Sequence, residues 1–125
     1  MELVFAFDTQ IPSGKNQQLF GHGHKYPNHR FVAWKALAAA DLLIQKAKLP
    51  TRTKMQLPLR GPLRMTVQYH PLDNYHRDLT GMCDALQHIL EYMEIIENDD
   101  QIKCLHWLWP YDNTGPCAVV MLEEL

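Results

Sequence analysis

An apolar stripe of helical period, residues 79–93, constrains the fold of this chain more than any other feature. Its members recur at intervals of three and four residues: Leu79, Met82, Cys83, Leu86, Ile89, Leu90 and Met93. Asp78 comes just before the stripe, where a carboxylate can cap free N–H groups, and Asn98, Asp99 and Asp100 follow it. The pattern predicts a helix of about four turns with acidic side chains beyond both ends.

Three segments nearer the N-terminus also have clear periodicity. Residues 2–7 are rich in β formers, and residues 63–70 alternate between apolar and polar side chains, so both are expected to be strands. Residues 31–48 follow a helical pattern that stops before Pro50. One broad core face of this helix is expected to hold Phe31, Trp34, Leu37, Ala38, Leu42 and either Ile44 or Ala47.

The C-terminal part is expected to finish the sheet. Residues 102–109 are apolar on both faces, and the turn residues 112–115 are expected to close a hairpin to a strand at 117–122. The predicted order is therefore strand, loop, helix, strand, helix, strand, strand. It indicates a single α+β domain over residues 1–125, with a small mixed sheet, helices on one face and the other face open.

Composition favours a protein of the cytoplasm. The 125 residues contain no run of eighteen apolar residues, and the N-terminus lacks a basic leader, so neither a membrane span nor a signal peptide is expected. Cys83, Cys104 and Cys117 are odd in number and lack C-x-x-C spacing. We expect all three to be reduced and buried.

Charge is divided along the chain. Residues 1–65 carry ten Lys and Arg against three Asp and Glu, a net charge of +7. Residues 66–125 carry two against eleven, a net charge of −9. Such a division suits a protein that holds phosphates with one part and a divalent cation with the other, although the two halves pairing across the fold is an equal alternative.

The long segment 9–29 is expected to be a basic, flexible loop. Pro and Gly recur in it, and Lys15, Lys25 and Arg30 lie within it or next to its end. Loops of this length inside a compact domain are uncommon and are usually functional or disordered. We therefore take Lys15, Lys25, Arg30 and, before the central helix, Arg77 as candidate contacts to DNA phosphates.

The central motif resembles a known family. Arg77-Asp78-Leu79, a helix, and then Asp99-Asp100-Gln101-Ile102 is similar to the core of the RusA-type Holliday junction resolvases, which reads Arg-Asp-Leu-Asp-Asn, helix, Asp-Asp-x-Gln-Ile/Val. The resemblance places Asp78 and Asp99 on two of the three catalytic aspartates. It implies Mg²⁺ as cofactor, with Mn²⁺ as the alternative, branched DNA as substrate, a homodimer, and a bacterial or phage origin.

The chain departs from that family at three positions. Thr80 stands where the family has its second catalytic aspartate, Gly81 replaces the following Asn, and Asp84 replaces a lysine. Asp84 is four residues after Thr80 and so faces the same side of a helix. We therefore hypothesise that Asp84 joins Asp78 and Asp99 in an acidic cluster.

Two functions remain open at this point. A metal-dependent nuclease would use Asp78, Asp84 and Asp99 as catalytic residues, with Asp100 as a further metal ligand, because carboxylate oxygens suit Mg²⁺. A short turn after residues 63–70 would deliver Asp78 to the sheet edge where Asp99 enters the next strand. The alternative is a non-catalytic relative that binds branched DNA or a protein partner, with the same carboxylates serving as helix caps.

Overall fold

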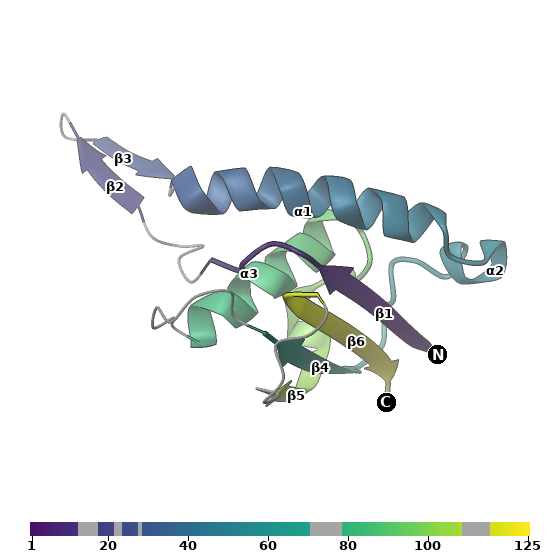
Figure 1. Ribbon diagram of the computed structural model, residues 1–125. Coiled ribbons are helices and arrows are strands. Elements are labelled where there is room, and N and C mark those ends of the chain that lie inside the picture. The colour runs from purple at the N-terminus through teal and green to yellow at the C-terminus, as the bar shows by residue number, and fades with distance from the viewer. Residues whose placement is uncertain (13–17, 22–23, 28, 71–78, 109–115) are drawn as a thin grey trace.

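The computed structural model describes residues 1–12, 18–21, 24–27, 29–70, 79–108 and 116–125 of the chain (Figure 1). It is a small α+β domain with one mixed four-stranded sheet. The elements in chain order are β1 (Glu2–Phe7), β2 (Gln18–Gly21), β3 (His24–Pro27), α1 (His29–Ala47), α2 (Thr51–Lys54), β4 (Leu63–Tyr69), α3 (Leu79–Tyr92), the 3-10 helix η1 (Asp99–Gln101), β5 (Ile102–Leu108) and β6 (Ala118–Glu124).

The strand order in the main sheet is β1-β6-β4-β5. Strand β6 pairs antiparallel with β1 on one side and with β4 on the other, whereas β5 pairs parallel with β4. The predicted hairpin between β5 and β6 is therefore wrong, because β4 lies between them. Strand β6 is thus an inner strand of the sheet, with β1 and β4 as its neighbours.

Parallel pairing of β4 with β5 also fixes where their ends lie. Leu63 at the start of β4 is the partner of Ile102 at the start of β5. The last residue of β4 and the first residue of β5 thus lie at opposite ends of the two strands, as a β-α-β crossover requires. Asp99 leads into β5 beside the start of β4, not beside its end. The prediction that the strand before Asp78 ends next to the start of the following strand is therefore wrong.

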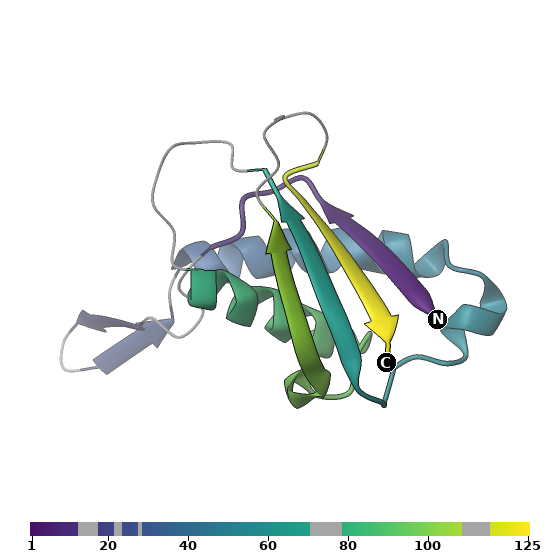
Figure 2. The same cartoon turned by 90° about the horizontal axis from the view of Figure 1, so that it is seen from below.

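Helices α1 and α3 cover the same face of the sheet (Figure 2). The stripe predicted for α3 is confirmed over most of its length, since Met82, Cys83, Leu86, Ile89 and Leu90 are buried. Leu79 is an exception, because its side chain is 43% exposed at the first position of the helix.

The predicted core face of α1 is too broad. Phe31, Trp34, Ala38 and Leu42 are buried, as expected. Leu37 and Ile44, however, are 59% and 56% exposed, and Ala47 is exposed as well. Helix α1 therefore has a narrow buried face and a second apolar surface that points away from the sheet.

The strands alternate between the core and an uncovered face. Leu3, Phe5 and Phe7 of β1, with Met65 and Val67 of β4, are buried beneath the helices. The residues between them on these strands are half-buried or exposed, among them Val4, Thr66 and Gln68. The expectation of one open sheet face is thus met within the described part of the chain.

Two smaller predictions need correction. Residues 9–29 are not loop throughout, because β2 and β3 pair antiparallel as a separate hairpin within them. All three cysteines are free, but Cys104 is only partly buried, since it lies on β5 at the end of the sheet. Among the helices described here, none combines the length and the apolar character that crossing a membrane requires.

Candidate functional site

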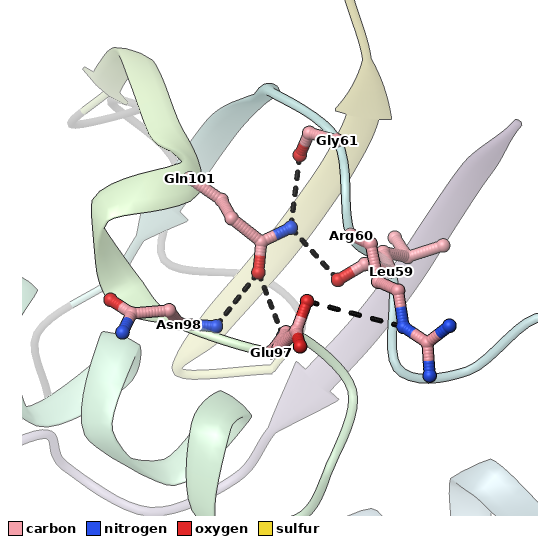
Figure 3. Close-up of polar contacts among 6 residues, drawn as sticks. All are labelled: Leu59, Arg60, Gly61, Glu97, Asn98 and Gln101. Atoms are coloured by element: carbon pink, nitrogen blue, oxygen red, sulfur yellow. Dashed lines mark hydrogen bonds and ion pairs between the residues drawn. The ribbon is translucent and has the colours of Figure 1, made fainter.

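A buried amide anchors the acidic segment before β5. Gln101 is 7% exposed, and its Oε1 accepts hydrogen bonds from the backbone N–H groups of Glu97 (2.8 Å) and Asn98 (2.7 Å). Its Nε2 donates to the carbonyl oxygens of Leu59 (2.8 Å) and Gly61 (2.9 Å), as Figure 3 shows. One side chain thereby satisfies four backbone groups from two segments that are about forty residues apart.

Asn98 caps the short helix η1 in a reciprocal arrangement. Its side chain accepts from the backbone N–H of Asp100 at 3.0 Å, while Gln101 bonds back to the N–H of Asn98. This is a capping box, and the sequence signal for it is the Asn-x-x-Gln spacing. We call residues 97–101 the acidic turn. Its backbone is fixed by Asn98 and Gln101, which leaves the side chains of Asp99 and Asp100 exposed to solvent.

Further carboxylates lie within the acidic turn and shortly before it in the chain. Glu91, Glu94 and Glu97 are exposed, as Asp99 and Asp100 are. The backbone N–H of Asp99 donates to Glu91 Oε2 at 3.2 Å, which ties the turn to the last turn of α3. Glu94 has a φ of 58°, so the chain reverses through a left-handed residue just after the helix.

Cationic groups balance part of this charge. Lys46 Nζ on α1 donates to the carbonyl oxygen of Met93 at 3.0 Å, beyond the C-terminal end of α3, where a cation is favourable. Arg60 Nε lies 4.0 Å from Glu97 Oε2, and both side chains are well exposed. The carboxylates of Asp99 and Asp100 therefore remain the acidic groups of the turn that project from a fixed backbone.

The structure brings together only part of the predicted catalytic set. Asp99 and Asp100 lie side by side in η1, whereas Asp84 is half-buried in the second turn of α3. Seven residues separate Asp84 from Glu91, about 10 Å along the helix axis. Asp78 lies outside the described residues. Within the described ranges, no three His, Cys, Asp or Glu side chains are grouped so that they could hold a metal ion.

Oxygen ligands of this kind nevertheless suit a hard divalent cation. Carboxylates in exposed turns bind Mg²⁺ with water completing the octahedron. Asp99 and Asp100 supply two such groups, whereas Asp84 and the start of α3 at Leu79 lie too far along the helix from Glu91 for Asp84 or Asp78 to join them. The donor chemistry thus fits Mg²⁺ or Mn²⁺, and the complete ligand set stays a prediction.

Two of the four residues predicted to contact DNA lie in the described part of the chain. Arg30 lies in the first turn of α1 and is exposed, and Lys25 belongs to β3, the strand just before that helix. Lys15 and Arg77 lie outside the described residues. The β2–β3 hairpin and the start of α1 are adjacent in Figure 1, so Lys25 and Arg30 come from one end of the molecule.

Sequence reasoning missed what Gln101 does. In the sequence, Gln101 is only one position of the acidic motif, although its amide determines the path of the acidic turn. The capping box was readable from Asn98 and Gln101, but the partners Leu59 and Gly61 were not, because they come from a distant segment. No family model matches the chain, and a search of curated proteins finds no match either. The resemblance to the RusA-type resolvases therefore stands on the motif alone.

Proposed function

We propose that this protein is a RusA-like, metal-dependent endodeoxyribonuclease that cuts four-way DNA junctions during recombination and repair. The observation that carries the proposal is the acidic turn: Asp99 and Asp100 project from a backbone fixed by Gln101, directly after the helix that follows Asp78. A rigid support for exposed carboxylates is what a metal-dependent hydrolase needs. An ordinary polar turn needs no buried amide with four bonds.

In the proposed site, Asp99 and Asp100 would hold Mg²⁺, with water completing its coordination. Asp78 and Asp84 of the same chain would not reach this ion, because Leu79 and Asp84 lie about 18 Å and about 10 Å along the axis of α3 from Glu91, which bonds to the N–H of Asp99. When bound, the cation would lower the pKa of a water molecule and neutralise charge on the phosphate oxygens. Gln101 would act as a positioning residue, since it touches the backbone of the turn and not the reacting atoms. Asn98 would keep the N–H of Asp100 satisfied, so that the turn does not rearrange when phosphate approaches.

The basic N-terminal half would hold the DNA. Lys25 and Arg30 lie at one end of the molecule, and Lys15 and Arg77 complete the proposed phosphate contacts. A homodimer suits a junction with two strands to cut, because a two-fold axis sets two equal sites against two equal phosphates. Such an enzyme would work in the cytoplasm, where bacterial and phage DNA is found.

A second function is favoured by a specific observation. Thr80 and Asp84 occupy positions where the resembling family has a catalytic aspartate and a lysine, Gly81 replaces the Asn that follows that aspartate, and Thr80 is exposed at the start of α3. A RusA-like protein without catalysis would bind branched DNA or a protein partner and use its carboxylates only as caps. The two functions predict different outcomes with the same substrate.

Cleavage of a labelled synthetic four-way junction, with Mg²⁺ or Mn²⁺, tests the proposal. We expect paired nicks near the branch and at least a hundredfold loss of rate in Asp99→Asn, because the loss of a metal-binding carboxylate removes several kcal/mol of transition-state stabilisation. Glu97→Gln is the matched control, since it removes one charge from the same turn but keeps the backbone bond to Gln101. Tight junction binding without cleavage in either metal would establish the non-catalytic alternative.

A further inference from the structure

Helix α1 carries a continuous apolar surface on the side that faces away from the sheet. The residues of this outer stripe are Val32, Ala33, Ala36, Leu37, Ala40, Leu43, Ile44 and Ala47, and all are exposed. Successive residues turn by 100° around a helix, so these eight positions fall within an arc of about 140°. No polar or charged side chain interrupts the outer stripe between its first and last residues.

The exposure of the outer stripe is unusual for a protein that works as a monomer. Val32 is 51% exposed, Leu37 is 59% exposed and Leu43 is 61% exposed. Surface helices normally have one apolar face, and a helix that is apolar on both sides is usually packed on both sides. Large contiguous apolar patches mark interaction sites. The inner face of α1 already packs on the core, so the outer stripe would need a separate protein surface to pack against.

The outer stripe is complementary to a copy of itself that runs in the opposite direction. Around Ala40, Leu37 and Leu43 lie three residues to either side, and Ala33 and Ala47 lie seven residues to either side. A two-fold axis at Ala40 would set Leu37 against Leu43, Ala33 against Ala47 and Ala36 against Ile44 of a second copy, so apolar residues meet apolar residues, as a self-complementary interface requires. This self-complementarity favours a second copy of the chain as the partner.

Side-chain size fits the same arrangement. The spacing of seven residues between Ala33, Ala40 and Ala47 is the repeat with which two helices stay in contact along their length. Alanine at these positions allows two backbones to approach closely. The leucines Leu37 and Leu43 then lie beside the seam and cover it.

We infer that the outer stripe of α1 is the surface through which two copies of this chain associate, with the helices antiparallel and the two-fold axis at Ala40. Figure 1 shows α1 as the outermost layer, with the sheet on its other side, so a second α1 has access to it. The antiparallel arrangement would place the β2–β3 hairpins of the two copies at opposite ends of the dimer, since each hairpin adjoins the start of its own α1.

One helix from each copy makes a small interface. Stable complexes usually bury about 800 Å² per partner, and one stripe of four large and four small side chains is at or below that size. We therefore expect a dissociation constant on the order of micromolar. The inference rests on the homodimer of the proposed function, but on neither its metal nor its DNA.

Sedimentation equilibrium across a concentration series that brackets the micromolar range tests the inference, without DNA or metal. We expect a monomer–dimer equilibrium in the unmodified protein and a dissociation constant raised on the order of 100-fold in Ala40→Glu, because two like charges would meet on the axis. Glu is a good helix former, and circular dichroism verifies that the fold is kept. Gln68→Glu, which adds the same charge on the open sheet face, is the matched control and should leave the equilibrium unchanged.

A mixing experiment tests whether Ala40 of one copy faces Ala40 of the other at the two-fold axis. Ala40→Lys should also remain monomeric alone, but an equimolar mixture of Ala40→Glu with Ala40→Lys should dimerise, because opposite charges then face each other at the axis. A strictly monomeric unmodified protein would overturn the inference. Dimerisation that Gln68→Glu abolishes and Ala40→Glu leaves intact would overturn it too, and would place the interface on the sheet. Since no cleavage is measured, either result leaves the nuclease proposal to its own test.

Discussion

The outer stripe of α1 and the acidic turn are both exposed to water, but different groups in them need a partner. In the outer stripe these are the side chains, and in the acidic turn they are the backbone N–H groups. In the outer stripe the backbone is regular helix, and the side chains are apolar groups that water solvates poorly. In the acidic turn the side chains are charged and well solvated, and the irregular backbone would be costly if its N–H groups were unpaired. Gln101 and Asn98 pair those groups from within the chain.

The two regions also differ in where these partners come from. The acidic turn has its backbone bonds supplied internally, so its exposed carboxylates can be used for a ligand without loss of structure. The described part of the chain supplies no packing surface for the outer stripe, and we infer that a second copy of the chain supplies it. Substitutions that act on one requirement at a time can separate the two cases.

The largest expected effect distinguishes the two faces of α1. Leu42 is fully buried and Leu43 is 61% exposed, although they are adjacent leucines. Leu42→Ala should lower the free energy of unfolding by about 2–5 kcal/mol, because it leaves a cavity in the core. Leu43→Ala should change it by less than about 0.5 kcal/mol in urea unfolding at a protein concentration low enough to keep the chain monomeric. Equal losses would mean that the outer stripe is packed within the monomer.

The next effect concerns the anchor of the acidic turn. Gln101→Leu keeps most of the volume but removes the partners of two backbone N–H groups and two carbonyl groups. We expect a loss of about 2–4 kcal/mol in the free energy of unfolding, because unpaired buried polar groups are costly. Gln68→Leu, at an exposed position on β4, is the control and should change stability little. A small effect at Gln101 would show that the turn does not depend on its amide.

A smaller effect is expected from the cap of η1. Asn98→Ala removes the acceptor for the N–H of Asp100, and loss of such a cap typically costs about 1 kcal/mol. Asn98→Asp keeps an acceptor and should retain most of the stability. Faster hydrogen exchange of the Asp100 amide in Asn98→Ala would locate the loss in the acidic turn. Unchanged exchange there would mean that Gln101 alone holds the turn.

The sequence predicted the local elements of this fold better than their arrangement. The stripe of α3, the strands β1 and β4, and the extent of α1 follow from periodicity, which depends only on neighbours along the chain. Strand order does not, and the predicted β5–β6 hairpin failed because β6 pairs with β1 and β4 instead. Periodicity also cannot tell a core face from an exposed apolar face, which is why it wrongly predicts that Leu37 and Ile44 belong to the core.

In the candidate site, too, the sequence predicts local features better than tertiary contacts. Asn98 and Gln101 form a capping box that three-residue spacing alone signals. The bonds from Gln101 to Leu59 and Gly61 depend on a tertiary contact and could not be read from the sequence. Helical spacing correctly put Asp84 on α3, but where α3 lies relative to η1 is again a matter of tertiary structure.

The smallest expected effect tests whether charge contributes to holding the acidic turn. Arg60 Nε and Glu97 Oε2 are 4.0 Å apart, and their side chains are 76% and 59% exposed. Water and salt screen such a pair, so Arg60→Ala should lower the free energy of unfolding by less than about 0.5 kcal/mol, and by less still at high salt. A double-mutant cycle with Glu97→Gln isolates the pair, since the N–H of residue 97 keeps its bond to Gln101. A coupling above about 1 kcal/mol would contradict the picture of a turn fixed by a buried amide, and would make its carboxylates part of the support instead of groups left available for a cation.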